Sequence, residues 1–177
     1  MHSYRDGETL HEAIVRVGRD EDADVIDFNE FVFLPVDHDY APDHAGPQPM
    51  RHYYFHEPKR PRLMRARRRV LAVSHIEAGG HTFTGEYRLA EESFALRHYI
   101  FRDAAHARAK YPTRTFERSE LARGWHGNRV NIREDEFVFP PSTELLRLDR
   151  PGDRNLSRKE PRKRHYWQWD QPRKLTS

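Results

Sequence analysis

The sequence predicts an α/β fold, a partial mixed sheet with flanking helices that ends in a polar C-terminal tail. Residues 6–19, DGETLHEAIVRVGR, place Leu10, Ile14 and Val17 on one helical stripe. Residues 24–34 instead alternate between two faces, as a strand does. Further strand patterns follow, separated by helices and long loops. The order of these elements fits an α/β or an α+β class.

Local signals place the remaining elements. The first helix takes Asp6 as its N-cap and Glu8 in its first turn, where the helix dipole favours an acid. Pro35 ends the first strand and opens a loop over 35–50 that suits a lid or a substrate loop. Beyond this loop we expect strands at 50–58, 68–76 and 93–101, and an edge strand at 131–141. A short helix is expected around Leu63 to Arg67. Two further helices are expected over Ala104 to Tyr111, capped by Asp103, and over Glu117 to Arg123, ended by Gly124.

The composition divides the chain into an ordered part and a polar part. Of the 177 residues, 36% are apolar and 33% are charged, which is a large charged share for a compact domain. We expect one domain, or part of one, over residues 1–149. Residues 150–177 form a basic aromatic tail that should be largely unpacked, except at Tyr166, Trp167 and Trp169.

Several classes of protein are excluded by what the sequence lacks. The absence of cysteine removes disulfides, thiolate zinc sites and cysteine nucleophiles. No apolar run reaches the roughly 18 residues that span a membrane, and residues 1–19 lack the apolar block of a signal peptide, so we expect a cytoplasmic protein. The net charge is only +3, yet 26 of the 31 basic residues are arginines and only five are lysines. Arginine suits bidentate contacts with phosphate or carboxylate.

Glu30 is a candidate catalytic residue. Its neighbours on one face of a regular strand are apolar: Ile26, Phe28, Val32 and Leu34. A carboxylate in such a row needs a partner or a raised pKa. The alternative is a bulge near Asn29 that turns Glu30 outward.

Histidines at the ends of strands are candidate metal ligands. The segment HIEAGGHTFTG carries His75 and His81 around a glycine pair, and His98 lies in the strand pattern SFALRHYIF. A histidine in an apolar row is more often a hydrogen-bonded core residue than a ligand. The familiar motifs do not match: H-x-E has no cysteines to complete a deaminase zinc site, and H-E-x-x-H, G-x-G-x-x-G, the Walker loop and G-x-S-x-G are absent.

Two arginines are candidates for binding an anion. Arg97 and Arg102 flank the end of the last strand pattern before the helix capped by Asp103. Guanidinium groups and helix N–H groups aimed at one spot suit a phosphate or diphosphate. Ion pairs with Glu91 or Glu92 are the structural alternative. A divalent ion held by carboxylate and imidazole would suit the same ligand, because a metal offsets charge on a leaving diphosphate.

Seven stretches, in this order, cover most of the chain: HSYRDGETLHEAI (2–14), DVIDFNEFVFLPVDHDYAPDH (24–44), MRHYYFHEP (50–58), HIEAGGHTFTG (75–85), ESFALRHYIFRDAAHARAKY (92–111), ELARGWHGNR (120–129) and PRKRHYWQW (161–169). Their order and spacing resemble the later part of bacterial glycosyltransferase family 2 proteins with GT-A-like catalytic domains. The resemblance implies transfer of a sugar from a nucleotide-sugar donor to a glycan or lipid-linked acceptor, with Mn²⁺ or Mg²⁺ as cofactor.

The resemblance also implies roles for the candidate residues. In the family an N-terminal βαβ half binds the nucleotide and ends in a D-x-D metal motif, and this sequence opens about where that strand has finished. We therefore expect the acceptor-side part of such an enzyme, with the donor half supplied by a longer reading frame or by a partner chain. The implied roles are acceptor deprotonation by Glu30 or Glu57, diphosphate contacts by Arg97 and Arg102, and metal ligation among His75, His81 and His98.

Two other functions fit parts of the sequence. The basic stretches Arg60–Arg69 and Arg158–Arg173, with Trp167 and Trp169 to stack bases, would suit a nucleic-acid-binding module. The near-neutral net charge and the absence of a known motif argue against it, and we expect no nucleic-acid partner. The second alternative is a non-catalytic remnant of an enzyme, which would expose apolar sheet edges. The tail also suits peripheral contact with anionic lipid at the inner membrane face.

Overall fold

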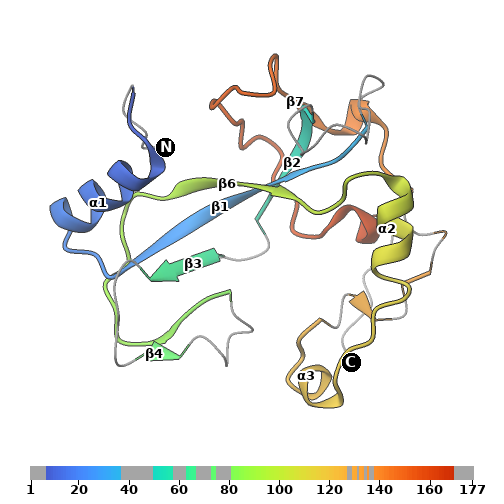
Figure 1. Ribbon diagram of the computed structural model, residues 1–177, viewed down its shortest axis with the longest axis horizontal. Coiled ribbons are helices and arrows are strands. Elements are labelled where there is room, and N and C mark those ends of the chain that lie inside the picture. Colours follow the sequence, from blue (N-terminus) through green and yellow to red (C-terminus); the bar gives the residue numbers. More distant parts are fainter. Residues whose placement is uncertain are drawn as a thin grey trace. The chain divides into compact units, whose positions relative to one another are not determined.

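The structure is a computed structural model that describes residues 7–36, 50–57, 63–66, 73–74, 81–126, 129–130, 132–133, 135 and 138–169. The chain has the expected α/β class (Figure 1). Its main elements are α1 (Leu10–Asp20), β1 (Val25–Phe33), β2 (His52–His56), β3 (Leu63–Ala66), β4 (Val73–Ser74), β5 (Thr84–Gly85), β6 (Phe94–Tyr99), α2 (Ala104–Lys110), α3 (Arg118–Ala122) and β7 (Leu146–Arg147). None of the helices in these residues combines the length and the apolar character needed to cross a membrane.

The strands form one larger sheet and one small one. The five-stranded sheet has the order β3–β1–β2–β7, and β6 also pairs with β1. The ladders of β1 with β3 and of β2 with β7 are antiparallel. Strands β4 and β5 pair separately as a short antiparallel sheet.

The chain divides into two compact units. Unit 1 comprises residues 1–31, 55–97 and 155–163, and unit 2 comprises residues 32–54, 98–154 and 164–177. Strands β1, β2 and β6 each contribute residues to both units. Each unit has a hydrophobic core of its own.

Helix α1 is capped by Thr9, whereas Asp6, the predicted cap, lies outside the described residues. The Thr9 hydroxyl accepts a hydrogen bond from the Glu12 N–H at 3.3 Å, and the Glu12 carboxylate accepts one from the Thr9 N–H at 2.8 Å. This reciprocal pair is a capping box. Because the helix then starts at Leu10, that residue lies at its end and is 41% exposed, while Ala13 and Val17 are fully buried. The predicted stripe was therefore wrong at Leu10 and confirmed at Val17.

Strand β1 confirms the prediction for 24–34, and all nine of its residues are buried. Its polar residues Asp27, Asn29 and Glu30 are buried together with the apolar ones. The Asn29 side-chain amide donates to the Ser93 hydroxyl at 2.6 Å. The strand is thus covered on both faces, which the alternating pattern alone did not indicate.

Two element predictions were wrong. The segment around Leu63 to Arg67 was predicted as a short helix, but Leu63–Ala66 forms β3, because its backbone completes the ladder with β1. The described residues of 131–141 contain no strand, and the short β7 further along pairs with β2 instead. The strands predicted at 50–58 and 93–101, and the helices after Asp103 and Glu117, are confirmed.

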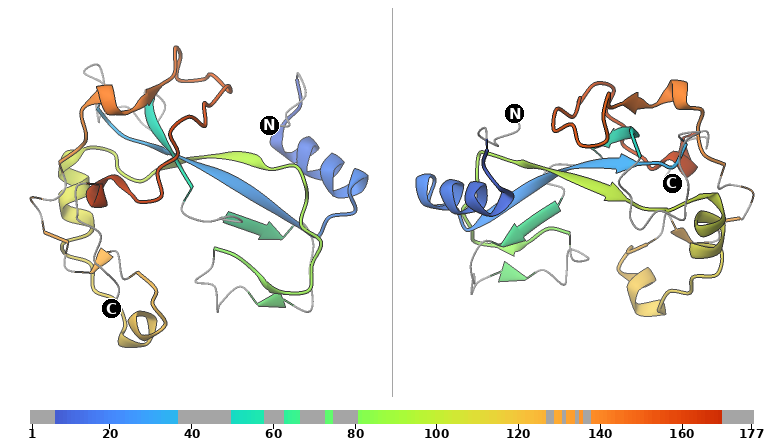
Figure 2. Two further views of the ribbon diagram at one scale, coloured as in Figure 1. Left: turned by 180° about the vertical axis from the view of Figure 1, so that it is seen from behind. Right: turned by 45° about the horizontal axis from the view of Figure 1, so that its top comes forward.

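The core of unit 1 lies where α1 packs beside the start of β1 (Figure 2). The rings of Phe28 and Phe94 lie 6.0 Å apart, centroid to centroid. Arg16, on the buried face of α1, holds the helix by ion pairs: its Nε lies 2.8 Å from Glu8 Oε1, and its Nη1 lies 3.2 Å from Glu92 Oε1. The buried core residues are Ala13, Val17, Ala23, Ile26, Phe28, Ala90 and Phe94.

The core of unit 2 is aromatic and takes in part of the polar C-terminal segment. Tyr166 and Trp167, in the 3-10 helix η4 (Tyr166–Gln168), are each 5% exposed, and Trp169 packs against the same core. Both rings of η4 lie 6.1 Å from the ring of Phe101, centroid to centroid. Aromatic side chains bury large apolar areas, so these few residues hold a segment whose composition is otherwise polar.

Candidate functional site

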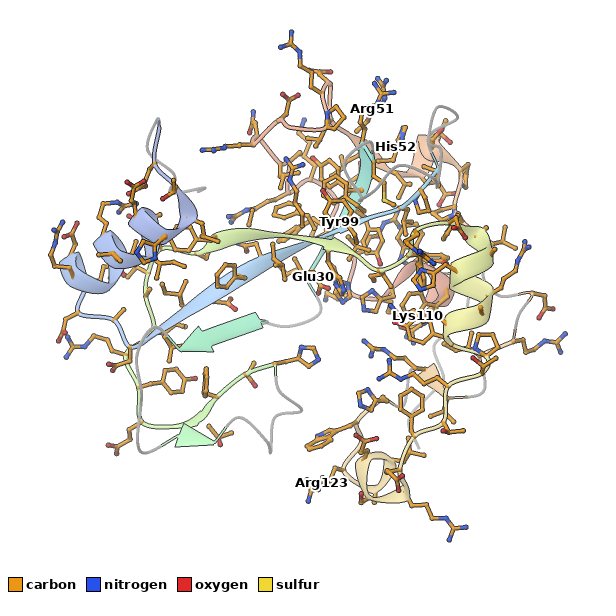
Figure 3. All side chains as sticks on the ribbon, viewed as in Figure 1. Glu30, Arg51, His52, Tyr99, Lys110 and Arg123 are labelled. Carbon is orange, nitrogen blue, oxygen red and sulfur yellow. The ribbon has the colours of Figure 1, made fainter. Side chains whose placement is uncertain are left out.

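Glu30 lies in the middle of β1 with 2% of its surface exposed (Figure 3). Its neighbour Phe31 stacks on Phe55, with 5.1 Å between the ring centroids. The alternative of an outward-turned Glu30 is therefore wrong, and the carboxylate belongs to the interior of unit 1.

Glu57 follows the end of β2, also in unit 1, and its side chain is half-buried. Its backbone N–H donates to the Arg162 carbonyl at 2.9 Å, and the Arg162 N–H donates to the Phe55 carbonyl at 2.8 Å. These bonds attach residues 155–163 to the end of β2. The guanidinium of Arg158, from the same segment, lies 6.0 Å from the centroid of Phe55. The Arg162 backbone and the Arg158 guanidinium therefore lie against the end of β2 in unit 1.

The other candidates of unit 1 are Arg97 and His81, and both are half-buried. Arg97 lies on β6, and His81 precedes β5. His75, the third predicted metal position, lies outside the described residues.

In unit 2, His98 lies half-buried on β6, and Arg102 is exposed just before α2. The Asp103 carboxylate accepts a hydrogen bond from the His106 N–H at 2.7 Å, which confirms the predicted cap. Glu92, one of the two acids named as alternative partners of the arginines, forms an ion pair with Arg16. Among the described residues no ion pair involves the Arg102 guanidinium.

The described residues contain no group of three histidine, aspartate or glutamate side chains that could hold a metal ion. Glu30, Glu57 and His81 belong to unit 1, and His98 belongs to unit 2. The predicted metal therefore remains a prediction, and no chemical step is derived through it.

A group of cations at the end of α2 was not predicted. Lys110 donates to the Ile100 carbonyl at 2.9 Å, and its Nζ lies 5.5 Å from the centroid of the Tyr111 ring. The guanidinium carbon of Arg129 lies 5.6 Å from the same centroid. Burial, and then the charges of Arg129 and Arg114, lower the pKa of Lys110. Like charges have therefore gathered in one place on unit 2.

The same positive field continues along α2. His106 and Lys110 lie four residues apart on one side of α2, and Arg102 lies four residues before His106, just outside the helix. Burial, and then the charges of Lys110 and Arg102, lower the pKa of His106, while Asp103 acts in the opposite direction. The four-residue spacing was visible in the sequence. The approach of Arg129 was not, because it comes from a separate segment with no regular pattern.

The described aromatic residues of the tail pack within unit 2. The ring of Trp167 is buried and packs on His165 with 4.6 Å between centroids. The Trp169 indole N–H donates to the Arg164 carbonyl at 2.9 Å, and its ring meets Tyr54 edge-on. A base could stack on Trp167 only if the core of unit 2 opened.

No protein-family model, no curated protein and no solved structure matches this chain. Its function therefore has to be inferred from the chemistry of its own residues.

Proposed function

We propose that this chain is the acceptor-side part of a glycosyltransferase, which transfers a sugar from a nucleotide-sugar donor to a glycan or lipid-linked acceptor. The observation that carries the proposal is the burial of the Glu30 carboxylate in the middle of β1. The seven sequence stretches that resemble family 2 glycosyltransferases, taken in their order, support it as well.

The proposed chemistry needs a base for the acceptor. A sugar hydroxyl becomes a competent nucleophile as its proton is removed, and a carboxylate near the hydroxyl can accept that proton. Glu30 is the first candidate because it is withdrawn from water, and Glu57, half-buried at the end of β2, is the second. The proton moves from the acceptor hydroxyl to a carboxylate oxygen. In the same step the acceptor oxygen forms a bond to the sugar carbon, and the bond from that carbon to the nucleoside diphosphate breaks.

The remaining roles concern the negative charge of the leaving diphosphate. Arg97 and Arg102 are proposed to bind it through charge-assisted hydrogen bonds. Mn²⁺ or Mg²⁺, with ligands among His75, His81 and His98, would offset the same charge when bound. The proposed proton transfer to Glu30 does not depend on that metal.

Acceptor binding and donor turnover test the proposal separately. The labelled chain should bind a subset of saccharides on a glycan array. With those saccharides, Mn²⁺ and a panel of nucleotide sugars, chromatography should detect released nucleoside diphosphate. Glu30→Gln should keep saccharide binding and lower turnover by roughly a hundredfold or more, the usual contribution of a general base. Glu144→Gln, an exposed residue of the 3-10 helix η3 (Ser142–Glu144), is the matched control.

Three outcomes are informative. Saccharide binding without turnover supports the acceptor-side assignment and indicates that the donor half must be supplied. Turnover that survives both Glu30→Gln and Glu57→Gln removes these residues from the chemistry. A chain that binds no saccharide and releases no diphosphate from any donor is not a glycosyltransferase part.

A further inference from the structure

We propose that unit 2 carries a binding site for a phosphoryl group, formed by Lys110, Arg129 and Tyr166 around the ring of Tyr111. Lys110 marks the site in Figure 3, at the end of α2. The proposal goes beyond glycosyl transfer and does not rest on it. None of these residues was among the candidates that the sequence indicated.

The first support is a pair of buried donors that the described chain leaves unused. The Nε of Arg129 and the hydroxyl of Tyr166 are both inaccessible to solvent, and neither has a hydrogen-bond partner among the described residues. Tyr166 as a whole is 5% exposed. A buried donor without an acceptor is destabilising, because it has given up its hydrogen bond to water. A ligand that brings acceptor oxygens would relieve that cost at two positions.

The second support is that these groups share one anchor. The ring of Tyr111, which is 4% exposed, has the Lys110 ammonium at 5.5 Å and the Arg129 guanidinium at 5.6 Å from its centroid. Tyr111 and Tyr166 both pack on the ring of Phe101, at 5.6 Å and 6.1 Å between centroids. Burial, and then the charge of Tyr111, raises the pKa of Tyr166. The ring of Trp167 lies 5.5 Å from Tyr111 and 5.3 Å from Tyr166, centroid to centroid, and so connects the two residues.

The third support is uncompensated charge. The charges of Arg129 and Arg114 both act on Lys110, and no carboxylate of the described residues forms an ion pair with any of the three. A carboxylate ligand would offset one positive charge. A phosphoryl group carries about −1.5 to −2 at neutral pH and offers three strong acceptor oxygens. It therefore matches both the charge and the number of donors better.

A structural role explains only part of this arrangement. The C-terminal end of a helix favours cations, and Lys110 already donates to the Ile100 carbonyl. Neither fact accounts for the unused donors of Arg129 and Tyr166. Lys110 and Arg129 are also half-buried rather than fully enclosed.

Calorimetric titration of the purified chain with inorganic phosphate, at constant ionic strength in chloride, tests the site. Binding should saturate at one phosphate per chain. Lys110→Met and Arg129→Met should each weaken it by roughly 10- to 100-fold, since a hydrogen bond to a charged group contributes about 1.5–3 kcal/mol and about 1.4 kcal/mol is tenfold in affinity. Tyr166→Phe should weaken it by roughly three- to tenfold. Arg108→Met is the matched control, because Arg108 is an exposed cation of the same helix.

Uridine diphosphate and a sugar phosphate, titrated in parallel, distinguish the source of the phosphoryl group. Tighter binding of the diphosphate identifies a nucleotide, and equal affinities show that the phosphoryl group alone is recognised. Both results support the site, even if the chain proves to bind no saccharide. Absence of saturable phosphate binding at millimolar concentration overturns it. So does an equal loss of affinity in Arg108→Met, which would leave only general charge attraction.

The wild-type chain provides a second readout that needs no substitution. With the lysine side chains isotopically labelled, phosphate should shift the Lys110 resonance and raise the pKa of its ammonium, because an adjacent anion favours the charged form. The exposed Lys159 serves as the internal reference. A Lys110 resonance that does not respond to phosphate contradicts the proposal whatever the stability of the variants.

Discussion

The hydroxyl of Tyr54 and the Nδ1 of His165 lie 3.0 Å apart, although 111 residues separate them in the sequence. Both residues are buried in unit 2, with 2% and 3% of their surfaces exposed. Tyr54 belongs to β2, and His165 immediately precedes η4. One buried hydrogen bond thus joins the sheet to the C-terminal segment.

Tyr54→Phe should lower the free energy of unfolding by about 1–2 kcal/mol, because it removes one partner of a buried hydrogen bond and keeps the ring. Urea denaturation followed by tryptophan fluorescence measures the change. Tyr87→Phe is the control, since the Tyr87 hydroxyl is half-buried and its bond to the Phe83 carbonyl is long, 3.4 Å. Equal effects of the two substitutions would show that the Tyr54–His165 bond adds nothing specific.

Tyr166→Phe should not lower the free energy of unfolding, in contrast to Tyr54→Phe. Its hydroxyl is buried and has no partner among the described residues, so its removal should leave stability unchanged or raise it by about 1 kcal/mol. The raised pKa of Tyr166, caused by burial and then by Tyr111, means that the unfolded chain ionises first as the pH rises above about 10. Stability is therefore lost at alkaline pH, and the variant should lose less of it. Urea midpoints at pH 8 and above pH 10 measure both effects, and a clear loss of stability at pH 8 would contradict them.

Arg16→Met should destabilise unit 1. The guanidinium is 10% exposed and bonds to Glu8 and Glu92, and these bonds raise its pKa further. Because Glu92 is 34% exposed, water screens part of the pair, and we expect a cost of about 2 kcal/mol. Arg19→Met, which removes the exposed pair with Asp20, should cost less than about 0.5 kcal/mol. Similar costs in both variants would mean that burial of Arg16 adds nothing.

The depressed pKa of His106 predicts a loss of stability on acidification. Burial, Lys110 and Arg102 disfavour its charged form in the folded chain. Its Nδ1 also accepts the Arg102 N–H at 3.1 Å, and protonation at Nδ1 would remove that acceptor. The unfolded chain takes up the proton first as the pH falls below about 6.5, so stability decreases from there through the folded pKa. His106→Gln should flatten this dependence between pH 7.5 and pH 5.5 in urea titrations. Ala105→Gln, on the same helix, should not.

Local sequence signals were sufficient to predict the helix ends that depend on contacts within a few residues. Asp103 caps α2 because its side chain reaches the N–H of His106, three residues further on. Gly124 follows α3 with a φ of +75°, a conformation that glycine adopts without steric cost. Prediction was wrong for Leu63–Ala66, since the strand there depends on a ladder with β1 and not on its own basic pattern.

For the candidate site, the sequence indicated which side chains could do chemistry but not where they lie. It marked Glu30 as a carboxylate in an apolar row, and burial followed because the row is covered on both faces of β1. It missed Lys110 and Arg129, whose shared position on the Tyr111 ring joins segments that have no common pattern.

By itself the sequence determined the α/β class, the main strands and capped helices, and the acids, histidines and arginines available for binding or catalysis. These follow from side-chain periodicity and from hydrogen bonds within a few residues. Only the tertiary structure decided that Tyr166 and Trp167 pack against Phe101 in the core of unit 2, and that cations gather there without an acid from the described residues. Both depend on contacts between distant segments, which are favoured by aromatic burial and leave no local trace.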